Sequence, residues 1–156
     1  MMFPTLDDDS ARFGLRLALR LAVTLGPDEE MGACAGGLRR NYPITGGCFV
    51  GRNIRGAVIG SGADISVLRP DGICEVDALY RIRAEDGTII VVHNHGLYDA
   101  PEFGPRGRDY LVTRPAFIAP TGQHDWLNRS LFIGTVDDIE GGVLVSCYEV
   151  HRSQAA

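Results

Sequence analysis

The chain has 156 residues, of which 45% are hydrophobic, which is enough for one ordinary core and leaves no room for a second domain. Its 15 basic and 20 acidic residues give a net charge of −5 without any run of Lys or Arg, so a nucleic-acid partner is not expected. The apolar stretch 15–25 is short and contains Arg16 and Arg20, so no membrane span is expected, and no export signal is visible. The four cysteines lack C-x-x-C spacing, and a cytoplasmic protein with reduced cysteines is predicted.

The first predicted element is a long strand over residues 12–25. Phe13 and the leucines that follow it occupy odd positions, while Arg16 and Arg20 occupy even ones. A strand separates these two classes onto opposite faces, whereas a helix would spread the leucines around its whole circumference. We therefore expect a strand whose odd positions form one buried face.

After this strand, short apolar runs alternate with turn signals that contain glycine. Such signals favour hairpins because glycine accepts the positive φ that a tight turn requires. The predicted turns lie at Thr45-Gly46-Gly47, Gly60-Ser61-Gly62, Pro70-Asp71-Gly72, Glu85-Asp86-Gly87 and Glu140-Gly141-Gly142. The predicted strands are 42–52, 55–59, 64–69, 73–83, 88–94, 110–117, 126–134 and 143–150.

This pattern predicts an all-β fold, a closed antiparallel β-barrel of about eight or more strands, because closure removes the exposed edges of a sheet. A barrel of this size can hold one small ligand. The barrel domain is predicted over residues 12–150, with loose segments at 1–11 and 151–156. The long irregular connection 97–108 is expected to form a loop at the rim of the barrel.

The stretch DGTIIVVHNHG, residues 86–96, raises the possibility of a metal site. His93 and His95 are two positions apart, so both point to the same face of a strand, as two ligands of one metal do. The spacing is similar to the first motif of the cupins, and a cupin-like metalloenzyme using His93, His95, Glu102 and His124 is one alternative. Glu102 and His124 are out of step with the cupin spacing, and a one-residue shift turns a side chain to the other face. This mismatch in spacing argues against a metal site at these residues.

Five stretches of the chain carry a more extensive resemblance. They read RRNYPITGGCFVG, GSGADISVLRPDG, VDALYRIRAEDGTIIVVHNHG, TRPAFIA and WLNRSLFIG. Together they resemble the uncharacterised domain-of-unknown-function family three-two-three-seven, from about Leu15 to Val150. The resemblance implies a closed antiparallel barrel, similar in build to allene oxide cyclase and the lipocalins, which assembles as a homo-oligomer.

The resemblance also points to particular positions. The recurring motifs of the family fall on Gly62-Ala63-Asp64, on Asp77, Ala78 and Tyr80, on Asn94 and Gly96, and on Trp126-Leu127-Asn128. Leu79 stands where relatives commonly have Arg. His93 and His95 flank these motif positions without belonging to them, which is a second argument against a metal site.

Two residues are the predicted catalytic groups. An inward-facing Asp in a dry barrel must be hydrogen-bonded, paired, or left with a raised pKa that suits proton transfer, so Asp64 is the expected general acid or base. The alternative is that Asp64 hydrogen-bonds the adjacent glycine turn. Asn128 can donate to a developing oxyanion, with Trp126 covering an apolar part of the substrate, or both can be structural.

Five further residues are predicted to bind substrate. On the strand 88–94, Asn94 shares a face with Ile90 and Val92, opposite the histidines, although periodicity does not decide which face is inner. The other candidates are Tyr80, Asp77, Tyr148 and Arg40. Asp77 can instead pair on an outer face, and Arg40 can be solvated or structural.

No pattern in the chain indicates a nucleotide-binding loop or a covalent cofactor, so no cofactor is expected. The sequence predicts an enzyme that binds a small, partly apolar, oxygenated substrate and promotes isomerisation, cyclisation or lyase-type and hydratase-type chemistry by proton transfer. A non-catalytic carrier of a small hydrophobic molecule is the second alternative.

Overall fold

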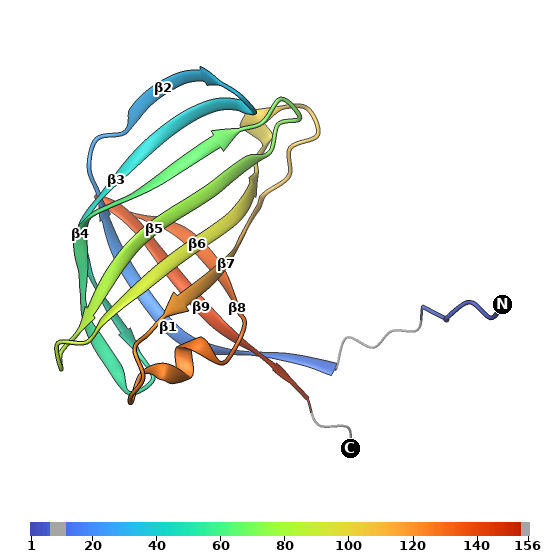
Figure 1. Ribbon diagram of the computed structural model, residues 1–156. Coiled ribbons are helices and arrows are strands. Elements are labelled where there is room, and N and C mark those ends of the chain that lie inside the picture. Colours follow the sequence, from blue (N-terminus) through green and yellow to red (C-terminus); the bar gives the residue numbers. More distant parts are fainter. Residues whose placement is uncertain (7–11, 154–156) are drawn as a thin grey trace.

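The computed structural model describes residues 1–6 and 12–153 and shows nine antiparallel strands that curl into a barrel (Figure 1). The strands are β1 (Phe13–Leu25), β2 (Glu29–Cys34), β3 (Gly37–Gly51), β4 (Ile54–Leu68), β5 (Cys74–Ala84), β6 (Ile89–Asp99), β7 (Tyr110–Ile118), β8 (Phe132–Ile139) and β9 (Gly142–Arg152). Two short 3-10 helices, η2 (Pro101–Phe103) and η3 (Asp125–Asn128), lie in the loops around β7.

Eight of the strands form a closed ring, which confirms the predicted fold class. The strand order is β1-β9-β8-β7-β6-β5-β4-β3, and β1 also pairs with β3, which closes the barrel. β2 pairs with β3 alone and arches over one end, whereas η3 lies at the opposite end (Figure 1). The core fills the interior and includes Leu19, Leu21, Ile82, Ile90, Val92, Phe117, Leu127 and Phe132.

Two of the predicted turns are bulges inside long strands. The register between β3 and β4 shifts between Ile44 and Cys48, and the register between β4 and β5 shifts between Ile59 and Ala63. Ser61 adopts a positive φ of 78° within the second shift. Because bulges bend strands, these glycine-rich stretches curve β3 and β4 around the barrel without ending them. The predicted strands 55–59 and 64–69 are therefore one strand.

The predicted strand over residues 12–25 is confirmed as β1, but the prediction of one buried face is wrong for its first part. Leu17 pairs with Tyr148 and Leu19 pairs with Cys147, so Ala18 is an extra residue in β1. This bulge reverses the faces: Leu19 is fully buried, while Leu15 is 56% exposed and Leu17 is 38% exposed. The apolar residues before the bulge lie on the outside of the barrel.

The predicted strand 126–134 is also corrected. Residues 125–128 form η3, and β8 begins at Phe132. Leu127 is 1% exposed and belongs to the core, and the rings of Trp126 and Phe132 are 6.5 Å apart. The helix η3 therefore closes the end of the barrel opposite β2.

The ends of the chain agree only in part with the predicted boundaries. β9 continues through His151 and Arg152, which pair with Gly14 and Phe13, so the domain extends beyond residue 150. Residues 1–6 have no regular structure, and the rest of the two predicted loose segments, residues 7–11 and 154–156, lies outside the described residues. In the described part of the chain, no helix has the length and apolar character needed to cross a membrane.

An ion pair joins the closed end to β9 and supports a stability prediction. Arg52 donates to Glu149 at 2.5 Å, and the Ser130 hydroxyl donates to the other Glu149 oxygen at 2.7 Å. These contacts, with the Ser130 bond the largest cause, lower the pKa of Glu149 from 4.5. A lowered folded-state pKa stabilises the protein above the unfolded value, and the effect is lost as the pH falls through the folded value.

We therefore expect Glu149→Gln to reduce the free energy of unfolding by about 1–2 kcal/mol at pH 7. The difference from wild type should shrink as the pH falls below 4.5 in urea titrations repeated across the pH range. Glu140→Gln, in the exposed turn before β9, is the control and should change little. A loss that is the same at every pH would contradict the assigned ion pair.

Candidate active site

Four residues from neighbouring strands form one row across the inner wall of the barrel. Tyr42 of β3 pairs with Asp64 of β4, Asp64 pairs with Ala78 of β5, and Ala78 pairs with Asn94 of β6. Cross-strand partners point to the same face of a sheet, so the buried Ala78 and Asn94 place the row inside. All four residues line the same interior cavity.

The cavity is small and mostly apolar. It has a volume of about 90 Å³, and its remaining lining is Val23, Leu25, Ile44, Val76, Tyr80, Leu111, Val136, Val143 and Val145. Tyr42 also lines a second hollow of about 260 Å³ beneath β2, so it stands where the two meet. Because ligand sites are commonly about 300–1,000 Å³, the interior cavity alone is smaller than a typical ligand site, whereas the two hollows together approach that range.

One carboxylate oxygen of Asp64 accepts a hydrogen bond, and the pKa of Asp64 is raised. Its Oδ1 accepts the backbone N–H of Asp77 at 2.9 Å, at a point where the ladder between β4 and β5 is interrupted. Burial raises the pKa of Asp64, the negative charge of Asp77 raises it further, and the bond from the Asp77 N–H opposes both. Among the described residues no hydrogen bond to Oδ2 is found, which leaves that oxygen available for a proton.

Two buried polar groups in the same cavity lack protein partners among the described residues. They are Asn94 Oδ1 and the Tyr80 hydroxyl, and the two residues are 3% and 4% exposed. Burial raises the pKa of Tyr80, so its phenol stays neutral and can donate. A buried polar group without a partner is unusual and indicates a place for water or ligand.

Gly62 makes the position of Tyr80 possible. A Cβ at residue 62 would lie 2.5 Å from the Cβ of Tyr80, which is closer than two such atoms can approach. The glycine in the motif Gly-Ala-Asp therefore allows the Tyr80 side chain to pack beside Asp64.

The comparison with known families gives a clear result. Residues 13–150 match the family described as "Protein of unknown function (DUF3237)". The chain belongs to this family. This confirms the resemblance found in the sequence, which covered nearly the same residues.

Relatives of the DUF3237 chain share its length and its fold. A UPF0311 protein from Rhodopseudomonas palustris is 29% identical over 163 residues and covers 96% of this chain and 99% of its own. A beta-barrel like protein from Acinetobacter baumannii has a TM-score of 0.79 at 23% identity, covering 93% of this chain and 100% of that one. An enzyme from Penicillium herquei has a TM-score of 0.72 at 22% identity, covering 97% and 99%. At these identities the two structures establish the fold alone.

The DUF3237 barrel does not bring Asn128 and Trp126 to the cavity, contrary to the predicted grouping with Asp64. The exposed Asn128 bonds both backbone groups of Ala119, accepting at 2.8 Å and donating at 2.7 Å. Trp126 packs at the closed end, where the Arg52 guanidinium lies 4.8 Å from its ring centre. Both residues anchor η3 because the segment forms a 3-10 helix and not an alternating strand.

Three other predicted substrate-binding residues also lie away from the DUF3237 cavity. Asp77 is exposed on the outer face of β5, and Tyr148 lies on the outer face of β9 in one row with Leu17 and Ile133. Arg40 lies in the hollow beneath β2 and pairs with Asp28 at 2.7 Å. Of the eight predicted residues, Asp64, Asn94 and Tyr80 share the cavity.

The residues of the cupin-like alternative are dispersed in the DUF3237 barrel. His93 bonds Asp77 and His95 accepts from Arg114, both on the outer wall. Glu102, in the loop after β6, accepts from the hydroxyl of Tyr98. No group of three or more His, Cys, Asp or Glu side chains able to hold a metal occurs in the part of the chain that the structure describes. The burial of Ile90 and Val92 settles which face of β6 is inner.

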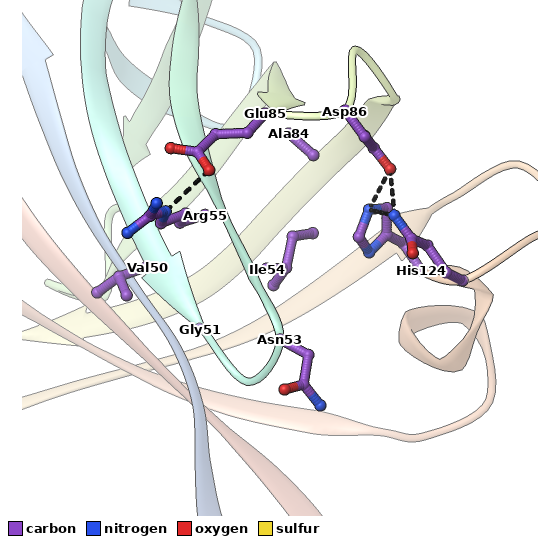
Figure 2. Close-up of a pocket in the computed structure, with 10 residues that line it drawn as sticks. Val50, Gly51, Asn53, Ile54, Arg55, Ala84, Glu85, Asp86 and His124 are labelled. Carbon is purple, nitrogen blue, oxygen red and sulfur yellow. Dashed lines mark hydrogen bonds and ion pairs between the residues drawn. The ribbon is translucent and has the colours of Figure 1, made fainter.

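His124, the fourth residue of that set, has a structural setting of its own. Figure 2 shows its ring pointing toward Asp86. His124 and Asp86 both line a hollow of about 320 Å³. The bond from His124 to the Asp86 carboxylate is 2.9 Å, and Thr88 donates its backbone N–H at the same distance. The Thr88 bond is the largest cause that lowers the pKa of Asp86. This cluster fixes the loop before η3 to the turn between β5 and β6.

Tyr42 is the cavity residue that sequence reasoning missed. It belongs to the quoted stretch RRNYPITGGCFVG and lies two positions before the buried Ile44, so its inward direction follows from alternation. Its proximity to Asp64 depends on the register between β3 and β4, which the bulges in both strands determine.

Proposed function

We propose that this protein is a cofactor-independent enzyme that binds a small, partly apolar, oxygenated substrate in the barrel cavity and transfers a proton through Asp64. Isomerisation, cyclisation and lyase-type or hydratase-type reactions are the chemistry in question. The observation that carries the proposal is a carboxyl group of raised pKa on the wall of an apolar cavity. Beside it lie two buried polar groups that have no hydrogen-bond partner in the part of the chain that the structure describes.

Three polar groups of the cavity have roles in this proposal. Asp64 gives a proton from its second oxygen to a substrate carbon or oxygen and takes a proton back later in the cycle, so the enzyme is unchanged. The Tyr80 hydroxyl donates to the substrate oxygen on which negative charge develops. Asn94 Oδ1 accepts from a substrate hydroxyl and orients it.

The lining of the cavity supports a neutral substrate at this end. The thirteen lining residues include no Lys, Arg or His, and Asp64 is the single ionisable acid among them with an ordinary pKa below neutrality. A buried anion would lack a counter-charge, so the reacting part of the substrate enters uncharged. Among proteins of this fold, the Penicillium herquei neighbour is described as an enzyme, which makes catalysis in such a barrel reasonable.

A carrier function is the second candidate, and the apolar walls of the cavity favour it. The experiment that separates the two is to purify the protein, extract any bound small molecule, return it to fresh protein and follow it by mass spectrometry. The enzyme proposal predicts a chemical change that depends on the protein. Recovery of the same molecule after prolonged incubation, at full occupancy, would favour the carrier.

The two unpartnered groups give a further prediction. Tyr80→Phe removes a donor that has no partner within residues 1–6 and 12–153, so the free energy of unfolding should be unchanged or higher, while turnover should fall by about 10-fold to 100-fold. The control is Tyr98→Phe, which removes a hydroxyl that donates to Glu102 in the rim loop. Thermal unfolding and initial rates measure both effects, and a Tyr80→Phe variant with wild-type turnover would remove Tyr80 from the mechanism.

The cytoplasmic location and the homo-oligomeric assembly stay predictions within this proposal. The apolar row on the outer wall formed by Leu17, Tyr148 and Ile133 supports assembly, because hydrophobic groups gathered on a surface commonly mark an interface.

A further inference from the structure

A second carboxylate and a histidine lie on the solvent side of the barrel wall, directly behind Asp64. We propose that Asp77 and His93 control the acidity of Asp64 from the outer face, so that they act as positioning residues for the proton transfer. The inference rests on the proposed role of Asp64 and extends it to the regulation of that site.

The geometry connects the two sides of the wall through one backbone amide. The Asp77 N–H donates to Asp64 Oδ1 at 2.9 Å, while the Asp77 side chain points outward and its Oδ1 lies 2.6 Å from His93 Nε2. Asp77 and His93 come from the adjacent strands β5 and β6. The carboxylates of Asp64 and Asp77 are therefore neighbours, but Asp64 faces the cavity and Asp77 faces solvent.

A negative charge on Asp77 and a positive charge on His93 have opposite effects on the pKa of Asp64. Burial is the largest cause of the raised pKa of Asp64, and the Asp77 carboxylate adds to it, because a like charge nearby disfavours a second negative charge. His93 Nε2 lies 2.6 Å from the Asp77 carboxylate, so a positive charge on the imidazole offsets the negative charge of Asp77. The acidity of Asp64 therefore depends on whether Asp77 is present and whether its partner is charged.

Other titratable and charged groups also face the region of Asp64. Tyr42 of β3 and Cys74 of β5 face the same region, and burial raises the pKa of both, so both are neutral near pH 7. Asn94 of β6 is uncharged. Arg40 lies beyond Tyr42, where its charge is matched by Asp28 and Glu30.

On the outer face, the neighbours of the pair are His95 and Arg114. Asp77 pairs in register with His95, and Arg114 Nε lies 3.4 Å from His95 Nδ1. The side chains of His93 and Asp77 are 54% and 52% exposed, so salt screens their influence. The effect on Asp64 should therefore weaken at high ionic strength, which an effect through altered packing would not do.

The test is a carbon NMR titration of the Asp64 side-chain carboxyl in wild type, Asp77→Asn, His93→Gln and a control. Asp77→Asn keeps the backbone donor and removes the charge, so the pKa of Asp64 should move down. His93→Gln removes the offsetting charge, so the pKa should move up. The control is Glu85→Gln, which makes an equal charge change in the turn at the other end of β5 and should leave the pKa of Asp64 unchanged.

The outcomes separate this inference from the proposed function. Shifts of opposite sign in the two variants, reduced in 0.5 M salt, support the control of acidity from outside, whether or not a substrate has been identified. A pKa of Asp64 in Asp77→Asn equal to that of the Glu85→Gln control overturns it, even if turnover depends on Asp64. With a substrate in hand, the same Asp77→Asn change should move the pH–rate profile to lower pH.

Discussion

Asp64→Asn is expected to lower turnover by about 10²–10⁴-fold, the range in which loss of a general acid or base falls. The amide keeps an oxygen that can accept the Asp77 N–H, so the wall of the barrel stays intact while the transferable proton is lost. Initial rates with the substrate found by ligand extraction measure the effect. Asp137→Asn makes the same chemical change on the exposed face of β8 and should keep wild-type rates.

The same variant has an expected effect on stability with a definite sign. The folded state holds the Asp64 proton more tightly than the unfolded chain, because burial raises the pKa from 3.8. Stability therefore falls as the pH rises from the unfolded value through the folded one, and ionisation opposes folding above it. Asp64→Asn removes this cost, so at pH 7 the variant should be at least as stable as wild type.

These two results together separate catalysis from structure. A residue retained for function at the expense of stability gives a stable and inactive variant. A variant that is strongly destabilised at pH 7 and turns over normally would show instead that Asp64 serves to hold β4 against β5.

Leu127→Ala carries the largest expected effect on stability, a loss of about 2–5 kcal/mol. Leu127 is 1% exposed and is the buried residue of η3, which closes the barrel opposite β2. Truncation leaves a cavity between η3 and the core that the barrel strands cannot collapse to fill. Urea unfolding measures the loss.

The matched control for this prediction is Leu131→Ala. Leu131 lies just beyond η3, is 81% exposed, and should change the free energy of unfolding by less than about 0.5 kcal/mol. If both variants lost the same small amount, η3 would not be the plug of the barrel.

The fold could be predicted because its main signals are local. The alternation in residues 13–25 and the Asp-Gly turns at 71–72 and 86–87 each depend on a few neighbouring residues. The bulges could not be predicted, because the same glycines that end a strand can also bend one, and pairing with the neighbouring strand decides between them. The extra residue at Ala18 is of this kind, and it moved Leu15 and Leu17 to the outer face.

The candidate site was predicted in part for a related reason. Asp64 follows a glycine-rich stretch, at the point where β4 resumes after its bulge. An acidic residue in this position could be recognised from the sequence as a candidate general acid or base. Its meeting with Tyr42 and Asn94 depends on the register of four strands, which no single segment encodes. The alternation predicted for Trp126 and Asn128 is wrong, because the segment forms a 3-10 helix that places both side chains away from the cavity.

The most direct test of the account is a crystal structure of the Asp64→Asn variant with the extracted ligand bound. We predict that the ligand occupies the interior cavity, with an oxygen within hydrogen-bonding distance of Asn94 Oδ1 or the Tyr80 hydroxyl and its reacting atom beside residue 64. A ligand seated instead on the outer wall, in the groove lined by His93, His95 and Asn128, with the interior cavity left to water, would contradict the account.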